Sequence, residues 1–417
     1  MPNEAIDIAI VGCGVSGATA ALAAVQNGAK ASIFEEHKRV GEPSHCSGHV
    51  GIMAFKKFSP QIPERLIENR IKGAVLHSPS GGQLTLYRPQ PVTWVLNRAE
   101  FDRHLASLAT DNGADLHLDS RVESFRRSSN GGFELKIGGR ARTELSCKMV
   151  IDAGGCGAPI SKYANLSALE STMLVNSAQV NVEALSDVDE DLVEVFFGQY
   201  YAPGFFGWII PRRDGSAKVG IAAGARANVR QCLERFVKKH PIVSSMLRRA
   251  KFLTKPTYHP IPVDGAKQRT YSDDILTVGD AASQVKPTTG GGIVFSLACG
   301  NIAGKIAAKA VQLGDTFATY LRDYERSWRK LLGFDLTVMT WLRKFLYRLP
   351  DSRLDRIFSA FGELNVDDVL NRTADIDFQG RTLLSLGRDP RLVVALLSAS
   401  ILSVPSLLHG NGTHHQK

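Results

Sequence analysis

The chain has 417 residues, of which 44% are hydrophobic and 22% are charged. This length predicts two or three domains, and the composition is that of an ordinary globular protein, which excludes extensive disorder. The net charge of +9 favours an anionic partner, but no zinc-finger, homeodomain or aromatic RNA-binding signature accompanies it, so we expect no nucleic acid.

The first 36 residues predict a strand, a glycine-rich turn, a helix and a second strand that ends in two acids. The expected strands are 5–11 and 31–34, and three turn glycines follow the spacing GxGxxG: Gly12, Gly14 and Gly17. Such glycines let a pyrophosphate approach the backbone at a helix start, and a carboxylate at Glu35, with Glu36 beside it, can take ribose hydroxyls. The unit predicts a site for the ADP half of a dinucleotide. No leader precedes it, so we expect a cytoplasmic protein.

A polar loop at 41–50 places Cys46 between His45 and His49, with Ser47 next to it. Most free cysteines are small buried hydrophobes, whereas the polar surroundings of Cys46 also allow a positional or proton-handling role. The three side chains would need a fourth ligand to hold zinc, and the sequence offers none, so we expect no metal.

Three separated stretches predict one nucleotide-binding domain. After the first unit, a helix starts near Arg98, a strand runs from about 116 to 122, and another covers 149–152. The third stretch is a strand that ends in an acid, then a glycine-rich turn and a long helix of small residues. Its candidate residues are Asp280, Gly290, Gly291, Gly292 and Ile293.

Between these stretches, residues 72–94 and 173–221 alternate apolar and polar side chains, which predicts a mostly antiparallel inserted sheet. One of its strands carries Phe206, Trp208 and Ile210. These side chains could form apolar walls for a long flexible ligand, although ordinary sheet packing is the alternative.

The C-terminal part predicts helices. An apolar stripe in 331–349 has Arg343, Lys344 and Arg348 beside it, and 392–404 is an apolar run too short to span a bilayer. The segment either packs on the body or contacts a membrane peripherally, and 410–417 predicts a frayed tail. We expect a nucleotide domain of 1–60, 95–160 and 268–330, a sheet domain of 61–94 and 161–267, and a helical region of 331–417.

The third stretch resembles the second flavin fingerprint of the glutathione-reductase-like FAD proteins. The resemblance implies FAD, with Asp280 at the ribitol chain and the glycine-rich helix start at the pyrimidine edge of the flavin, where a helix N-terminus stabilises negative charge. Arg98 resembles a position that reaches the flavin or its phosphates in class A flavin monooxygenases, and Val122 one whose backbone pairs with adenine. The motif at 153–155 departs from the Ala-Asp-Gly of many relatives.

The Cys46 loop and the segment 203–211 resemble the geranylgeranyl reductase family, with Phe206 and Ile210 in place of a Tyr and a Phe. The resemblance implies FAD-dependent reduction of isoprenoid double bonds, a membrane-associated enzyme, Cys46 and Ser47 beside the flavin, and Cys46 or its water as the proton source. Phe206, Trp208 and Ile210 would line the substrate tunnel. The electron donor stays open between NAD(P)H, ferredoxin and another reductant.

The fold expected is therefore α/β: a Rossmann-type FAD domain of the glutathione-reductase type, an inserted antiparallel substrate sheet and C-terminal helices. Two other functions stay open. Segment 206–211 is also close to the Trp-x-Trp-x-Ile-Pro pattern of flavin-dependent halogenases, so an aromatic monooxygenase or halogenase is the alternative. A third class is a non-catalytic flavoprotein that passes electrons to quinone.

Overall fold

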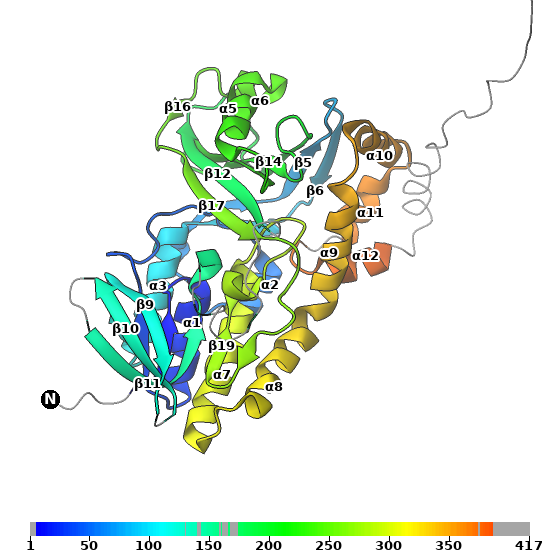
Figure 1. Ribbon diagram of the computed structural model, residues 1–417. Coiled ribbons are helices and arrows are strands. Elements are labelled where there is room, and N and C mark those ends of the chain that lie inside the picture. Colours follow the sequence, from blue (N-terminus) through cyan, green and yellow to red (C-terminus); the bar gives the residue numbers. More distant parts are fainter. Residues whose placement is uncertain are drawn as a thin grey trace, which may run out of the picture.

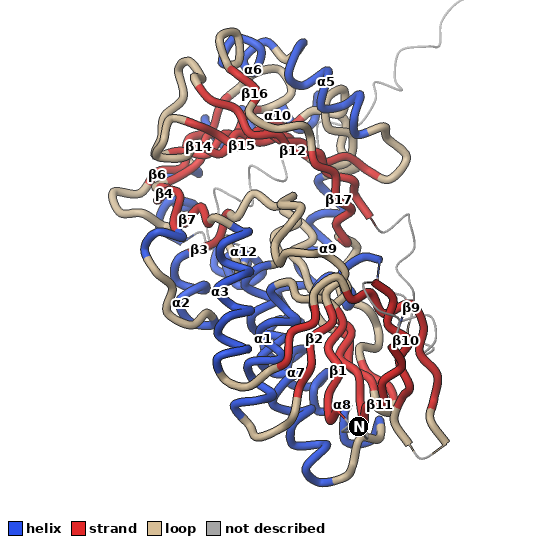
Figure 2. Tube along the Cα trace, turned by 90° about the vertical axis from the view of Figure 1, so that its left-hand side faces the viewer, coloured by secondary structure: helices blue, strands red, loops and turns tan. Residues whose placement is uncertain are grey.

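The computed structural model describes residues 6–129, 131–139, 143–157, 160, 166, 174–373 and 376–386. Two large sheets lie at opposite ends of the molecule, and loops and a small sheet connect them (Figure 2). A row of C-terminal helices runs along one side from the first sheet to the second (Figure 1). This arrangement brings segments from across the chain together between the sheets.

The first sheet builds the predicted nucleotide-binding unit. Its strand order is β18-β19-β11-β1-β2-β8, and β9 and β10 extend from β11 as an antiparallel addition. The central pairs β1·β2, β1·β11 and β11·β19 are parallel. The strand bounds are β1 (Ile6–Val11), β2 (Ala31–Phe34), β8 (Asp115–His117), β9 (Ser120–Arg127), β10 (Phe133–Gly139), β11 (Thr143–Asp152), β18 (Tyr271–Ser272) and β19 (Ile275–Thr277).

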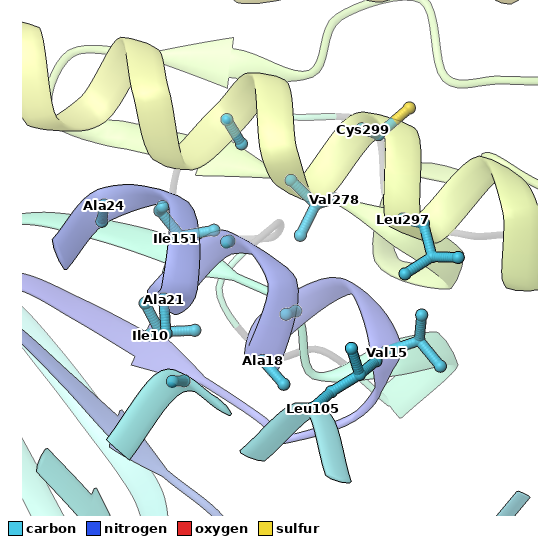
Figure 3. Packing of buried hydrophobic residues seen from close by; sticks show 14 of the residues in the cluster. Ile10, Val15, Ala18, Ala21, Ala24, Leu105, Ile151, Val278, Leu297 and Cys299 are labelled. Carbon is cyan, nitrogen blue, oxygen red and sulfur yellow. The ribbon is translucent and has the colours of Figure 1, made fainter. Parts of the chain in front are cut away.

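Helix packing covers this sheet. Figure 3 shows α1 and α7 side by side over buried Ile10, Ile151 and Val278. A Cβ at Gly304 would lie 2.2 Å from the carbonyl oxygen of Ala20, so a glycine is needed for this close approach. The helix bounds are α1 (Val15–Gln26), α3 (Arg98–Asp111), α7 (Ile293–Leu313) and α8 (Ala318–Trp328).

Among the described helices, α7 is the one long and apolar enough to cross a membrane. Most of it is buried inside the protein, where small residues such as Ala303 and Ala307 face the nucleotide-binding core. Its apolar character is therefore that of a core helix.

The second sheet has the order β16-β12-β15-β14-β13-β5-β6, and β17 also pairs with β12. Its pairs are antiparallel except for β13 and β5, which run parallel. Helices α5 and α6 bury their apolar side chains against it. The bounds are β5 (Gly73–His77), β6 (Gln83–Tyr87), β12 (Leu174–Glu183), β13 (Leu192–Phe197), β14 (Phe206–Pro211), β15 (Ser216–Gly224), α5 (Val229–Lys239), α6 (Pro241–Met246), β16 (Lys251–Phe252) and β17 (Thr257–Pro262).

A small antiparallel sheet, β3-β7-β4, joins the two halves directly after the Cys46 loop. Its elements are β3 (His49–Gly51), α2 (Ile52–Phe58), a 3-10 turn (Glu64–Leu66), β4 (Ile67–Ile71) and β7 (Thr93–Leu96). Strand β7 leads into α3, where the Asn97 side chain accepts a hydrogen bond from the Glu100 amide and caps the helix. The predicted helix start at Arg98 is confirmed.

The C-terminal segment after α8 touches the second sheet and the small sheet. On α10, the Asp355 carboxylate accepts hydrogen bonds from Ser78 Oγ and from the Ser80 amide, at 2.7 and 2.9 Å. Asp377 accepts one from the Gly51 amide at 3.0 Å. The elements are a π-helical turn (Arg329–Gly333), α9 (Phe334–Leu346), α10 (Asp351–Glu363), α11 (Val366–Thr373) and α12 (Gln379–Leu386).

One sequence-based expectation was wrong. The strand expected at 116–122 is two strands, because Asp119, with a φ of 52°, turns the chain between β8 and β9. The helix predicted in 331–349 is present, and it follows the π-helical turn. Its Leu336 and Met339 are buried while Phe334 and Phe345 are exposed, so packing on the body and membrane contact both stay open for this segment.

The fold class itself is confirmed: an α/β architecture with a parallel-centred first sheet, a second, largely antiparallel sheet and C-terminal helices. The proposed domain limits remain a prediction. The apolar run 392–404 and the tail 410–417 lie outside the described residues.

Candidate functional site

The GxGxxG turn forms an open cradle at the start of α1. Gly12 has a φ of +93°, and a Cβ there would lie 2.7 Å from the Ala153 carbonyl oxygen. A Cβ on Gly17 would lie 2.0 Å from the Gly12 oxygen, so these two glycines permit the turn and the helix packing. Gly14 differs, because nothing lies within 4 Å of its Cβ position. That free space is where a pyrophosphate can meet the amides of the helix start.

Glu35 lies beside this cradle. Its carboxylate accepts hydrogen bonds from the Cys13 amide at 2.8 Å and from the His37 amide at 3.0 Å. The acid is buried next to the turn and oriented by the backbone, as a ribose-binding carboxylate needs to be. Glu36 points elsewhere and pairs with Arg121 at 3.5 Å. Val122 is buried near the start of β9 rather than at the end of its strand.

The second fingerprint meets the first at one point. Gly279, after β19, has a φ of +65°, and a Cβ there would lie 2.6 Å from Ser16 Oγ on α1. Asp280 follows, and its carboxylate oxygen is 3.4 Å from the Cβ position of Gly292. The structure thus brings Asp280 and the start of α7 next to the glycines of the opening turn, which precede Asp280 by more than 260 residues in sequence.

Residues 287–292, called here the glycine loop, lead into α7 at Ile293. Gly290 has a φ of +71°, and its Cβ position lies 3.3 Å from Ile261 and 3.6 Å from the Phe205 ring. Next to the loop, Lys286 Nζ pairs with Asp377 at 2.8 Å, and both side chains are almost fully buried. The loop is therefore fixed on one side by an ion pair and borders apolar side chains on the other.

The Cys46 loop is anchored by a buried lysine. Lys218, on β15, donates to the Ser47 carbonyl at 2.9 Å and to the Leu96 carbonyl at 3.2 Å, and it pairs with Glu68 at 2.6 Å. Burial lowers the pKa of Lys218, and the Glu68 ion pair opposes that effect. Cys46 is partly exposed, and its sulfur accepts a hydrogen bond from the Gly48 amide at 3.5 Å.

Arg98 lies beside Cys46 but is held by another residue. Its guanidinium makes two hydrogen bonds to the Asp102 carboxylate, at 3.0 and 2.9 Å. Burial opposes the charge of Arg98, but Asp102 and then Cys46 outweigh burial and raise the pKa of the guanidinium. Arg98 therefore keeps its positive charge next to the thiol, at the edge of the cradle.

Two histidines of the loop are neutral. Burial, with the nearby His259 and Arg98, lowers the pKa of His45 to about 4, and its ring stacks on that of His259 at 3.7 Å. Burial and the two lysines Lys286 and Lys218 lower the pKa of His49 to about 3. Neither imidazole can act as an acid near neutral pH.

Within the described residues, the one group with the spacing of a metal site is Cys156, His259 and Asp280, whose ligand atoms lie within 4.8 Å of one another. Cys156 and His259 carried no sequence signal. Because Asp280 belongs to the second flavin fingerprint, we assign this group to the cofactor cradle. His45 and His49 point to different partners, since His49 Nε2 is hydrogen-bonded to Thr93 Oγ1 at 2.6 Å.

Phe206, Trp208 and Ile210 share one face of β14, as their alternation requires. Phe206 stacks on Phe205, with ring centroids 4.5 Å apart, and Trp208 donates to Gln179 Oε1 at 3.2 Å. Ile210 is buried in a cluster with Ile71, Val95 and Val193, against which Trp208 also packs. Phe206 and Trp208 belong in addition to the cluster around Phe205, whose ring borders the glycine loop at Gly290, and Ile210 is not a member of that cluster.

Sequence reasoning did not assign Ile261 and Tyr347 to an apolar wall. Tyr347, from the loop after α9, stacks on Phe205 at 5.4 Å and donates from its hydroxyl to the Thr288 carbonyl at 2.9 Å. We call Phe205, Phe206, Trp208, Ile261 and Tyr347 the aromatic wall. No local motif marks Tyr347, because its role depends on a contact across 59 residues of sequence.

Comparisons with known proteins agree with this geometry. A family model for FAD dependent oxidoreductases matches residues 7–167, and one for the geranylgeranyl reductase catalytic domain matches residues 174–252. The digeranylgeranylglycerophospholipid reductase of Methanocaldococcus jannaschii is 32% identical over 369 residues, which cover 87% of this chain and 92% of that protein. The chain belongs to the geranylgeranyl reductase family.

Other relatives of this family are similarly close. Digeranylgeranylglycerophospholipid reductase 2 of Methanothermobacter thermautotrophicus is 32% identical and covers 84% of this chain and 90% of its own length. A solved geranylgeranyl bacteriochlorophyll reductase-like protein of Thermoplasma acidophilum is 25% identical, with a TM-score of 0.82, and the match covers 95% and 99% of the two chains. The solved halogenase PltM, 13% identical with a TM-score of 0.66, shares the fold alone.

The chain is therefore an FAD-dependent oxidoreductase of the geranylgeranyl reductase family. Its residues fit the cofactor. Gly14 leaves open space at a helix start, Glu35 is aimed at the adjacent turn, and Asp280 lies at the junction of the two fingerprints.

Proposed function

We propose that this protein reduces the carbon–carbon double bonds of geranylgeranyl chains in membrane-lipid precursors. The observation that carries the proposal is the direct contact between the glycine loop and the aromatic wall. A Cβ on Gly290 would already touch Phe205 and Ile261, so a substrate at the ring end of the cofactor meets aromatic and aliphatic side chains. Such walls suit a long hydrocarbon chain that offers no polar partner.

Reduction of a carbon–carbon double bond adds one hydride and one proton. Because an isolated alkene is not polarised, hydride adds to one carbon readily only if an acid protonates the other. Reduced FAD supplies the hydride when it is bound. Gly12, Gly14 and Glu35 would hold its ADP half, and Asp280 with the glycine loop would hold the flavin end. Cys46, or a water that it positions, donates the proton to the alkene carbon. The aromatic wall keeps bulk water from the reacting carbons.

Of the candidate acids, Cys46 fits best. The neighbouring His45 and His49 are neutral at physiological pH, because burial and nearby cations lower the pKa values of their imidazoles. Lys218 and the Gly48 amide hold the loop in place around the thiol. A catalytic role of Cys46 is part of the proposal, and so are the assignments of Ser47, Arg98 and Val122 to the cofactor.

We also propose peripheral contact with a membrane through the outer face of α9. Phe334 and Phe345 are each 46% exposed, and Trp341 is 73% exposed. Lys344 lies between Trp341 and Phe345 in the sequence. An apolar face with a basic flank on a chain of net charge +9 is complementary to anionic lipid headgroups.

The function is tested by anaerobic incubation of the dithionite-reduced protein with geranylgeranyl glycerophospholipid, followed by mass spectrometry. Dithionite makes the result independent of whether NAD(P)H, ferredoxin or another donor serves the protein. We expect the lipid to gain about two mass units for each reduced bond. An unchanged lipid, together with oxygen-dependent conversion of an aromatic compound, would assign the protein to the monooxygenases or halogenases instead.

A further inference from the structure

A half-buried cation packs against the aromatic wall. The guanidinium of Arg343, on α9, packs 5.2 Å from the centroid of the Phe205 ring and 5.0 Å from that of Tyr347. Its Nη1 atom is buried and has no hydrogen-bond partner among the described residues. The ring faces attract the charge, but they do not satisfy the Nη1 donors as an oxygen acceptor would.

The acid nearest to this cation is already engaged. Asp264 contributes a favourable charge to Arg343, but its carboxylate pairs with Lys344 at 3.7 Å. Burial lowers the pKa of Arg343, which reflects the cost of keeping a guanidinium in apolar surroundings. A half-buried cation of this kind is stabilised when an anion completes its hydrogen bonds.

The position of Arg343 relates it to the proposed substrate site. Phe205 separates it from the glycine loop, since the same ring lies 3.6 Å from the Cβ position of Gly290. Tyr347 connects the two regions through its hydrogen bond to the Thr288 carbonyl. An anion at Arg343 would thus lie one aromatic ring away from the loop that borders the flavin end of the cradle.

We propose that Arg343 binds a phosphate group at the polar end of the isoprenoid substrate and so orients the chain along the aromatic wall. This inference rests on the proposed function, which supplies a substrate with one charged end and an otherwise apolar chain. Planar guanidinium groups match phosphate oxygens with two parallel hydrogen bonds, which lysine cannot reproduce.

The test compares Arg343→Gln and Arg343→Lys with Arg322→Gln, a control that removes the same charge from an exposed site on α8. Each holoenzyme is assayed anaerobically in detergent with geranylgeranyl glycerophosphate and with uncharged geranylgeraniol. Calorimetric binding of the saturated glycerophosphate lipid to oxidised holoenzyme gives a readout that does not depend on turnover. Inorganic phosphate is added as a competitor in a parallel series.

We expect Arg343→Gln to raise the KM for the phosphate-bearing lipid, and the Kd of its saturated form, about tenfold or more. The KM for geranylgeraniol and the affinity for FAD should stay as in the Arg322→Gln control. Arg343→Lys should fall between the two, because it keeps the charge and loses the planar fork. Inorganic phosphate should compete in the wild type and lose that effect in Arg343→Gln.

If Arg343→Gln raises the KM for both lipids equally, Arg343 serves packing alone and the assignment is wrong. An unchanged Kd for the saturated phosphate-bearing lipid would overturn the assignment as well. If inorganic phosphate competes while the two lipids bind alike in every variant, the site takes a free anion and the substrate assignment is wrong. If the wild type reduces neither lipid, the proposed function fails, and the calorimetric comparison still decides whether Arg343 binds phosphate.

Discussion

At the scale of single residues, the glycines of the opening turn have separable roles. A Cβ on Gly17 would collide with the Gly12 carbonyl, whereas a Cβ on Gly14 would enter open space. Gly14→Ala should therefore leave the apoprotein folded, with an unfolding free energy within about 1 kcal/mol of wild type, since the weaker helix cap and the stiffer unfolded chain oppose each other, and weaken FAD binding. Gly17→Ala should lower the melting temperature itself. Thermal unfolding of the apoproteins and fluorescence titration with FAD distinguish the two effects.

Cys46 is the residue whose replacement tests the proton source. Cys46→Ala should retain FAD and slow alkene reduction about 100-fold or more, the usual contribution of a positioned general acid. Cys232, buried under the second sheet, is a suitable control, because Cys232→Ala removes a thiol of the same size far from the cradle. Equal single-turnover rates for Cys46→Ala and the control would remove Cys46 from the mechanism.

Buried His49 should make the unfolding free energy depend on pH. Its pKa is lowered to about 3 in the folded protein, first by burial and then by Lys286 and Lys218. Because the unfolded chain binds that proton near pH 6.5, the stability due to neutral His49 is present above pH 6.5 and is lost as the pH falls toward 3. His49→Gln should lose less stability between pH 7 and pH 4, by at least about 1 kcal/mol in denaturant titrations. Parallel stability curves for the two proteins would contradict this assignment.

At the scale of elements, the Cys46 loop depends on a strand from the other sheet. Lys218→Met removes three partners at once and leaves Glu68 with Arg212, 3.7 Å away, as its remaining cation, so we expect a loss of about 3–5 kcal/mol in unfolding free energy. The double variant Lys218→Met, Glu68→Leu should recover part of that stability, since it removes the buried acid but also the acid that pairs with Arg212. It should still lose alkene reduction and become more sensitive to proteolysis near Ser47. Full activity in the double variant would show that the loop does not need this anchor.

Elements also show where sequence reasoning succeeds. The first unit, the helix start at Arg98 and the segment from β19 to α7 follow from glycine spacing, caps and local periodicity, and these signals lie within a few residues. The break at Asp119 was missed, because a single left-handed residue leaves no periodic trace, and the π-helical turn before α9 leaves none either. Contacts such as Lys286 with Asp377 cannot be read from sequence, since they join segments 91 residues apart.

At the scale of the whole molecule, α9 contributes to both proposed contacts with lipid. Its inner side carries Arg343 against the aromatic wall, and its outer side exposes Trp341 and Phe345. Trp341→Ser with Phe345→Ser should reduce sedimentation with anionic vesicles several-fold and leave the reduction of detergent-dispersed lipid unchanged. Lys344→Gln should weaken vesicle binding mainly at low salt. If none of the three substitutions reduces the fraction of protein that sediments with the vesicles, the membrane contact lies elsewhere on the protein.

In the enzyme that we propose, the flavin end of one FAD faces a wall of apolar side chains that suits a hydrocarbon chain. The most direct test follows the absorbance of the anaerobically reduced flavin after rapid mixing with geranylgeranyl lipid. We predict that the flavin is reoxidised by the unsaturated lipid and stays reduced with its saturated counterpart. A flavin that stays reduced with both lipids, and is reoxidised only when oxygen enters, would contradict the account.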